Sequence, residues 1–150
     1  MIERFAKRVG DPRTEEGRAL LTERSPLTHV DAIVRPLLIG QGANDPRVKQ
    51  AEADQIVEAM KSNNLPVTYV IYPDEGHGFQ RQPNNLSFFA ITDVFLASHL
   101  GGRFQPIEAA DLEGSSIQVP DGAELIPGLV EALAAGEAAE EEDTENEVGE

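Results

Sequence analysis

Residues 36–48 have the sequence PLLIGQGANDPRV, in which a proline opens the apolar run Leu37 to Ile39. A short apolar run between turn residues is typical of a buried strand. The run ends at a glycine-rich segment, and a turn signal with Asp45 before Pro46 follows it. The sequence therefore predicts a strand whose carboxyl end leads into a loop that carries a carboxylate.

A helix and a second strand are predicted after this loop. In residues 51–63 apolar side chains recur at intervals of three and four, which predicts a helix with one buried face. Residues 67–72, VTYVIY, are rich in β-branched and aromatic side chains and predict a strand that stops at Pro73. The residues expected on the buried helical face are Ala53, Ile56, Val57 and Met60.

The second strand is followed by the loop DEGHGFQRQ, residues 74–82, and then by a second amphipathic pattern in residues 86–100. This pattern predicts a helix that ends at Gly101-Gly102. We expect its buried face to contain Leu86, Phe89, Ala90, Val94 and either Phe95 or Leu96.

A strand, a helix and a strand in this order predict two parallel, neighbouring strands. Asp45 then follows the carboxyl end of the first strand, and His77 follows that of the second. Open parallel sheets place their functional sites at this edge. A carboxylate that binds one imidazole nitrogen allows the other nitrogen to act as a general base, so Asp45 and His77 are a candidate catalytic pair.

Less specific interpretations remain for the same residues. Asp45 could be a turn residue before Pro46, and His77 could be a loop histidine between two glycines. A metal site formed by Asp45, Asp74, Glu75 and His77 is a further alternative, although no established metal-ligand spacing is present. Residues 40–45 lack the third glycine of a dinucleotide-binding loop. The remaining histidines are expected in a loop, His29, and at a helix C-terminus, His99.

Composition excludes several classes of protein. The 150 residues include 12 Lys and Arg against 27 Asp and Glu, a net charge of -15, and they include no cysteine. Nucleic-acid and membrane-surface partners are unfavourable for such an acidic chain, and disulfides, thiolate nucleophiles and cysteine-ligated metals are excluded. No signal-peptide pattern and no run of about 18 apolar residues is present, so we expect a soluble chain of undetermined compartment.

The charge divides the chain near Arg103. Residues 1–103 contain all 12 basic residues and 13 acidic ones, whereas residues 104–150 contain 14 acidic residues and no basic one. Scattered apolar residues in 104–136 predict an extended segment that packs on the domain formed by 1–103. Residues 137–150, EAAEEEDTENEVGE, have almost nothing to bury and predict a disordered acidic tail.

The motifs QGANDPRV, residues 41–48, and PDEGHGF, residues 73–79, resemble the C-terminal part of the catalytic domain of the prolyl oligopeptidase family of serine peptidases. The similarity extends from RVGDP to about residue 133, and the chain resembles bacterial dipeptidyl-peptidase and acylaminoacyl-peptidase-like members. It implies an α/β fold, namely the C-terminal fragment of an α/β-hydrolase with its last two parallel strands and their helices.

The same resemblance implies a role for each motif residue. Asp45 would be the acid and His77 the base of a catalytic triad. Arg47 would bind a carbonyl of the substrate peptide, and Val48 would form a wall of the pocket for the residue before the cleaved bond. The resemblance implies peptide substrates, such as small peptides or N-terminal dipeptides, and neither a cofactor nor a metal.

The sequence departs from the family pattern at the nucleophile. The triad of this fold needs a serine on a G-x-S-x-G turn, and no such motif occurs in the 150 residues; Ser25, the one serine before Asp45, has no flanking glycine. We therefore expect no activity from this chain alone and a complementary serine-bearing N-terminal half as partner. The alternatives are a noncatalytic remnant or binding module, and part of an esterase of the same fold.

Overall fold

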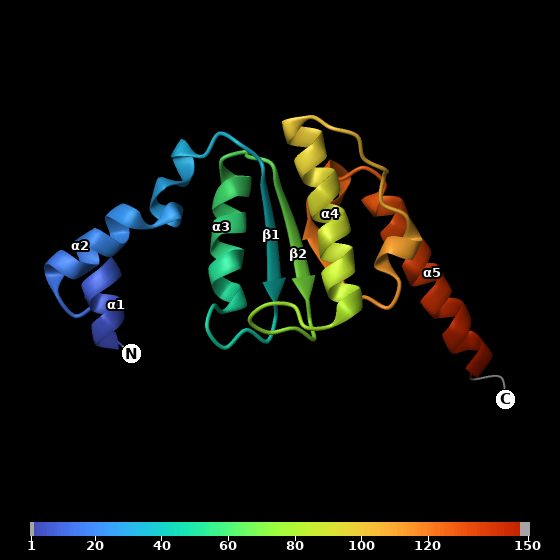
Figure 1. Ribbon diagram of the computed structural model, residues 1–150, viewed down its shortest axis with the longest axis horizontal. Helices are drawn as coiled ribbons and strands as arrows, with labels where there is room; N and C mark the ends of the chain where they lie inside the picture. Colours follow the sequence, from blue (N-terminus) through green and yellow to red (C-terminus); the bar gives the residue numbers. More distant parts are fainter. Residues whose placement is uncertain (1, 148–150) are drawn as a thin grey trace.

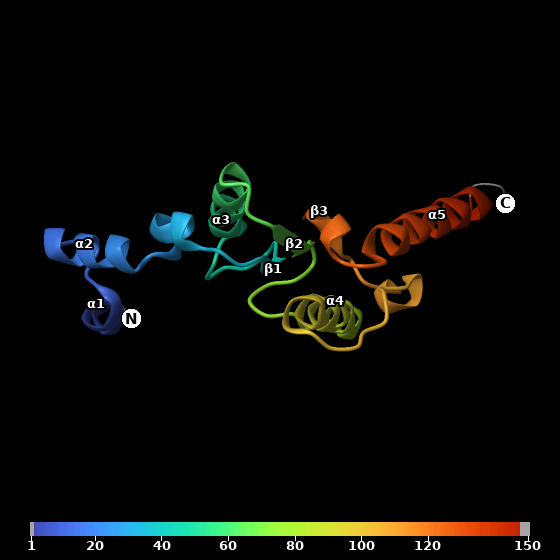
Figure 2. The ribbon, with the colours of Figure 1, turned by 90° about the horizontal axis from the view of Figure 1, so that it is seen from above.

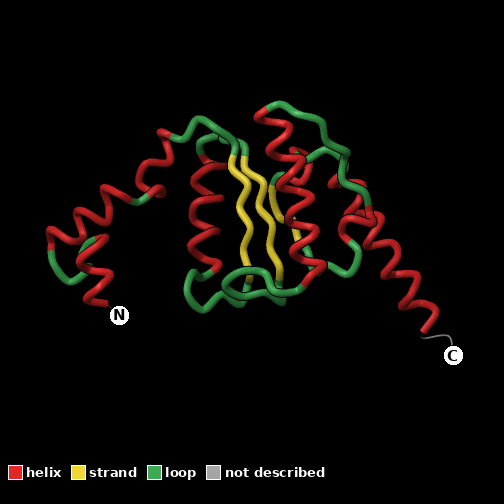
Figure 3. The backbone as a smooth tube through the Cα atoms, viewed as in Figure 1, coloured by secondary structure: helices red, strands yellow, loops and turns green. Residues whose placement is uncertain are grey.

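The computed structural model describes residues 2–147, and its centre is a sheet with the strand order β1-β2-β3 (Figures 1 and 3). Strands β1 (Leu37–Gly42) and β2 (Val67–Tyr72) are parallel, with Leu37 opposite Val67 and Gly42 opposite Tyr72. Helix α3 (Gln50–Ser62) connects them. The predicted pair of parallel neighbouring strands is confirmed.

Every residue of β2 is buried, because helices cover both faces of the sheet. Figure 2 shows α3 on one face and α4 (Gln82–Leu100) on the other. Alternate side chains of β2 point to opposite faces. Tyr69 and Ile71 pack with α3, whereas Val70 and Tyr72 pack with α4.

The predicted buried face of α3 is confirmed. Ala53, Val57 and Met60 are buried in the cluster beneath that helix, and Ile56 packs against the cluster while partly exposed. An apolar repeat of three and four residues was sufficient here because the side chains that α3 buries in this cluster are all apolar. Asp54 of the same helix accepts the Tyr69 hydroxyl at 2.9 Å from the margin of the cluster.

The predicted buried face of α4 is partly wrong. Val94 is buried, and Ala90 and Phe95 pack against the core, but Leu86, Phe89 and Leu96 are 57%, 65% and 45% exposed. The helix begins at Gln82 and buries two polar residues of its first turns, Asn84 and Ser87. Their hydrogen bonds to neighbouring segments determine which face points inward, so three large apolar side chains face outward.

The segment 104–136 is not simply extended. It forms the short helical turns η2 (Ala109–Leu112) and η3 (Ala123–Leu125) and a third strand, β3 (Gln118–Asp121), before α5 (Leu129–Glu147) begins. Strand β3 is antiparallel to β2, with an irregular register near Tyr69 and Ile71. Its Pro120 suits a strand at the edge of a sheet, because proline has no N–H to donate.

Side chains of this segment complete the core on the α4 side of the sheet. Five are buried there with Val70 and Tyr72: Ile107, Leu112, Ile126, Leu129 and Ala132. Two backbone hydrogen bonds, from Ile107 N to Pro127 O at 2.9 Å and from Ala132 N to Gly128 O at 3.0 Å, tie the segment together. The segment therefore contributes core residues instead of only lying on the surface.

The predicted disordered acidic tail needs a correction. The structure continues α5 through Glu147, so residues 137–147 are helical, whereas residues 148–150 lie outside the described part. Residues 137–147 contain no glycine or proline and are rich in alanine and glutamate, which have high helix propensities. Local helix propensity therefore accounts for the helix in residues 137–147.

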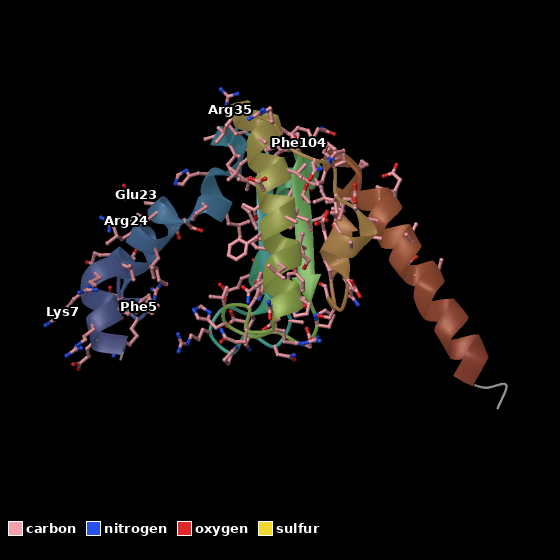
Figure 4. The ribbon with its side chains drawn as sticks, turned by 45° about the vertical axis from the view of Figure 1, so that its right-hand side comes forward. Phe5, Lys7, Glu23, Arg24, Arg35 and Phe104 are labelled. Atoms are coloured by element: carbon pink, nitrogen blue, oxygen red, sulfur yellow. The ribbon has the colours of Figure 1, made fainter. Side chains whose placement is uncertain are left out.

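The N-terminal residues form an arm that projects from the sheet (Figures 1 and 4). It comprises α1 (Ile2–Val9), α2 (Glu15–Arg24) and the 3-10 segment η1 (Pro26–Ala32). Phe5 on α1 is 67% exposed. Asn63 at the end of α3 donates to the Asp31 carboxylate at 2.8 Å, which connects η1 to the rest of the fold.

The two histidines outside the candidate pair are His29 and His99. His29 is inside η1, although a loop was predicted for it. His99 is in the last turn of α4, as predicted, and its ring contacts that of Phe95 with centroids 4.6 Å apart. Within residues 2–147 no helix has the length and apolar character that crossing a membrane requires.

The buried position of Leu129 generates a stability prediction. Leu129 is 0% exposed, whereas its neighbour Val130 is 48% exposed. We expect Leu129→Ala to lower the free energy of unfolding by about 2–5 kcal/mol, because it leaves a cavity in the core. Val130→Ala is the control and should change it by less than about 0.5 kcal/mol. Urea unfolding of the full chain measures both, and equal effects would contradict the assignment of this segment to the core.

Candidate functional site

The loops that follow β1 and β2 lie side by side at the carboxyl edge of the sheet (Figure 1). Backbone hydrogen bonds join them, from Ala43 N to Tyr72 O at 3.0 Å and from Asn44 N to Glu75 O at 2.9 Å. A Cβ at Gly42 would lie 2.3 Å from Gly76 O, so this close approach requires glycine. Parallel pairing and this contact bring the two loops within hydrogen-bonding distance.

Asp45 and His77 meet where these loops touch. His77 Nδ1 lies 2.8 Å from Asp45 Oδ2. The Asp45 side chain is 8% exposed, whereas that of His77 is 47% exposed. The carboxylate is an acceptor, so Nδ1 carries the proton and Nε2 is left with a lone pair. Among the hydrogen bonds of residues 2–147, none uses His77 Nε2.

The other carboxylate oxygen of Asp45 is held by its own loop. Oδ1 accepts from Arg47 N at 2.7 Å and from Val48 N at 3.0 Å. The turn interpretation of Asp45 is therefore correct, and it coexists with the bond to His77. One oxygen closes the turn and fixes the carboxylate, while the other faces the imidazole.

Opposing effects act on the acidity of Asp45. Burial raises its pKa, but the N–H groups of Val48 and Arg47 and the His77 imidazole together outweigh burial. The net effect lowers the pKa of Asp45 from 3.8 to about 2. The group is therefore ionised at neutral pH and can stabilise an imidazolium at His77.

The side chains of Arg47 and Val48 are exposed beside the pair. Their backbone groups hold Asp45, and Val48 O also accepts from the buried Gln41 Nε2 at 3.1 Å. Gln41 additionally donates to Gly42 O at 2.8 Å. The contribution of Gln41 was not predicted, because a glutamine between two glycines resembles an ordinary turn.

The His77 loop is supported by a buried carboxylate that the sequence did not assign to this task. Glu75 is 2% exposed and accepts from Gln80 N and Arg81 N, each at 2.8 Å. Asn84, which is 0% exposed, donates to the same carboxylate at 3.0 Å. In the sequence, the one signal for this role is the position of Glu75 directly before Gly-His-Gly. A buried carboxylate needs hydrogen-bond donors, and here the backbone of the loop provides them.

The four residues of the alternative metal site do not converge. Asp45 faces His77, and Glu75 faces backbone N–H groups of its own loop. Asp74 forms an ion pair with Arg81 and accepts from Ser116. In residues 2–147 no group of three or more His, Cys, Asp or Glu side chains is arranged to hold a metal ion.

Ser25 is not brought to the pair. It ends α2 and precedes η1 on the projecting arm, with its backbone N–H bonded to Thr22 O. Figure 4 shows the adjacent Arg24 on this arm. Within the described residues His77 has Asp45 as its one side-chain hydrogen-bond partner, so the site consists of a carboxylate and an imidazole.

Comparison with known proteins connects this geometry to a family. A family model described as the prolyl oligopeptidase family matches residues 2–103. The chain is 66% identical over 132 residues to dipeptidyl aminopeptidase BIII of Pseudoxanthomonas mexicana, which covers 88% of this chain and 19% of that protein. It is 47% identical over 112 residues to dipeptidyl peptidase family member 6 of Caenorhabditis elegans, covering 74% of this chain and 15% of that protein.

A solved structure agrees with the sequence matches. The structure of a Mycobacterium tuberculosis puromycin-hydrolysing peptidase has a TM-score of 0.59 and 30% identity, covering 66% of this chain and 15% of that chain. The chain therefore spans less than a fifth of the length of each of these three proteins. The match over residues 2–103 shows that this chain belongs to the prolyl oligopeptidase family, and the 66% identity to dipeptidyl aminopeptidase BIII agrees with it.

Proposed function

We propose that this chain supplies the acid and the base of a serine peptidase. The observation that carries the proposal is the 2.8 Å hydrogen bond between His77 Nδ1 and Asp45 Oδ2, which leaves Nε2 to act on another group. Asp45 holds the imidazole in one tautomer and stabilises its protonated form. His77 Nε2 is then the general base.

The proposed reaction needs a serine from outside these 150 residues. His77 Nε2 takes the proton of that serine hydroxyl as its oxygen attacks the carbonyl carbon of the substrate. The proton then passes from Nε2 to the leaving amine, and the C–N bond breaks to give an acyl-enzyme. Water, deprotonated by the same nitrogen, releases the acid and restores the serine.

Substrate contacts are proposed for the two residues next to Asp45. The Arg47 guanidinium would donate to a carbonyl of the bound peptide, and the Val48 side chain would form one wall of the pocket for the residue before the cleaved bond. Both side chains are exposed at the carboxyl edge of the sheet, and their backbone N–H groups donate to Asp45. The names of the two dipeptidyl relatives support N-terminal dipeptides as the substrate class.

The complementary serine-bearing part is proposed to dock on the uncovered surfaces of this fold. Strand β1 pairs with β2 alone among the described strands, so its other edge is unpaired. The outward face of α4 presents Leu86, Phe89 and Leu96. An open strand edge beside exposed apolar side chains is the expected signature of a missing structural neighbour.

Mixing this chain with the serine-bearing region of a family member tests the proposal. We expect hydrolysis of a dipeptidyl chromogenic substrate only in the mixture, since neither part holds the whole triad. His77→Ala should lower kcat/KM by at least about 10³-fold and Asp45→Asn by about 10⁴-fold. The matched control is His99→Ala, which removes a histidine far from the pair and should leave activity unchanged.

The outcomes of this experiment separate the alternatives. Preference for a short-chain ester over the dipeptidyl substrate would indicate an esterase. Binding of the two parts without turnover would contradict the catalytic proposal and favour a noncatalytic module.

A second prediction concerns the pH at which the Asp45 carboxylate becomes protonated. The pKa of Asp45 is lowered to about 2, so the hydrogen bonds that its carboxylate accepts from Val48 N, Arg47 N and His77 stabilise the fold above the ordinary value of 3.8. This stabilisation is lost as pH falls towards 2. NMR titration of the Asp45 carboxyl carbon should give a midpoint near 2, with Asp45→Asn used to assign the signal. A midpoint close to 3.8 would show that the carboxylate is not held as described.

A further inference from the structure

The loop that carries His77 has little conformational preference of its own. His77 lies between Gly76 and Gly78, and Gly78 has a φ of +88°. Glycine restricts the backbone least of all residues, so Gly-His-Gly alone does not fix an imidazole. A hydrogen bond with Asp45 requires that the loop be positioned by groups outside the tripeptide.

The Glu75 carboxylate spans this loop from one end to the other. Its Oε2 accepts from Gln80 N and its Oε1 from Arg81 N, both at 2.8 Å. These two hydrogen bonds close the backbone from residue 75 to residue 81 into a ring that includes His77. Its own backbone O accepts from Asn44 N at 2.9 Å, in the loop that carries Asp45. Glu75 therefore holds the His77 loop closed and attaches it to the Asp45 loop.

Burial of this carboxylate is costly, and among the ion pairs of residues 2–147 none includes Glu75. Glu75 is 2% exposed, and the nearby Arg81 guanidinium pairs with Asp74 instead. Burial raises the pKa of Glu75, but the N–H groups of Gln80, Asn84 and Arg81 outweigh burial and lower it. Directed N–H donors thus keep a charged group ionised in a place where an apolar side chain would be cheaper to bury.

Asn84 connects the carboxylate to a distant segment. Its Nδ2 donates to Glu75 Oε1 and to Asp74 Oδ1, each at 3.0 Å, and its Oδ1 accepts from Ser116 N at 3.0 Å. Beside it, Ser87 Oγ lies 2.9 Å from the Tyr72 hydroxyl and 3.0 Å from Ser115 Oγ. The His77 loop is therefore joined to α4 and to the segment before β3.

From this arrangement we infer that Glu75 is the positioning residue for His77. The inference rests on the proposed function of His77 as the base, because a general base must point at the group that it deprotonates. Glu75 contacts no reacting atom. It acts by holding the backbone on both sides of His77, so that Nδ1 stays on Asp45 and Nε2 faces the same point in every turnover.

Glutamine cannot replace Glu75 although it has the same shape. Both carboxylate oxygens accept backbone N–H groups, whereas a glutamine offers one carbonyl oxygen and one NH₂ donor. In Glu75→Gln either Gln80 N or Arg81 N must face a donor. We expect the ring to open on that side and the His77 imidazole to leave Asp45 for part of the time.

NMR of the full chain tests the positioning directly. In the unaltered chain, the His77 Nδ1–H should give an observable resonance, and the amides of Gln80 and Arg81 should be protected from hydrogen exchange. Glu75→Gln should remove that resonance and accelerate exchange of at least one of the two amides about tenfold or more. The matched control is Glu113→Gln, since Glu113 is exposed and makes no side-chain hydrogen bond among the described residues.

Two results would overturn the inference. One is a Glu75→Gln chain that keeps the His77 Nδ1–H resonance and the amide protection. The other is an unaltered chain whose Gln80 and Arg81 amides exchange as fast as unprotected ones, a measurement that needs no variant to fold.

The kinetics of the mixture with the serine-bearing region test the role of Glu75 in catalysis separately. Glu75→Gln should lower kcat about 10- to 100-fold with little change in KM, because direction of the base matters in the transition state more than in substrate binding. An equal rise in KM would contradict positioning. If the unaltered mixture is inactive, the proposed function fails, whereas the NMR comparison still decides whether Glu75 holds His77 on Asp45.

Discussion

The parallel pairing of β1 with β2 is the constraint on which the site depends. Parallel strands end at the same edge, so two loops far apart in the chain become neighbours there. Gly42 allows their backbones to touch, and the hydrogen bonds of Ala43 and Asn44 join them. The contact between Asp45 and His77 is a consequence of that pairing, and α3 provides the connection that makes it parallel.

The support around the pair differs between its two members. Asp45 is fixed by two N–H groups of the loop immediately after it, so its position is a local property. His77 depends on Glu75 and Asn84, and through them on α4 and Ser116. Because Asp45 is held locally and His77 is held by residues distant in the sequence, substitutions well outside the two loops can disturb the site.

The sequence predicted what apolar periodicity and chain order determine. It was sufficient for α3 and β2, whose apolar side chains are buried, and for β1, whose apolar residues Leu37 to Ile39 are partly buried. The edge shared by Asp45 and His77 then follows from the order of these elements in the chain. It was wrong for Leu86 and Phe89 because buried polar residues, Asn84 among them, set the orientation of α4. The short strand β3 was missed because the four residues QVPD contain a proline and no apolar run.

The two edges of the sheet are chemically unequal. On β3, Pro120 cannot donate a hydrogen bond, so that edge is a poor template for a further strand. On the other side, β1 has β2 as its one strand neighbour among the described residues, so the backbone groups of its outer edge have no strand partner. A further strand is therefore expected to add to the sheet at β1 and not at β3. If two copies of the chain paired through their β1 edges, both outer edges of the joined sheet would be β3 strands with Pro120. Such an assembly would stop at a dimer and would not continue into a fibre.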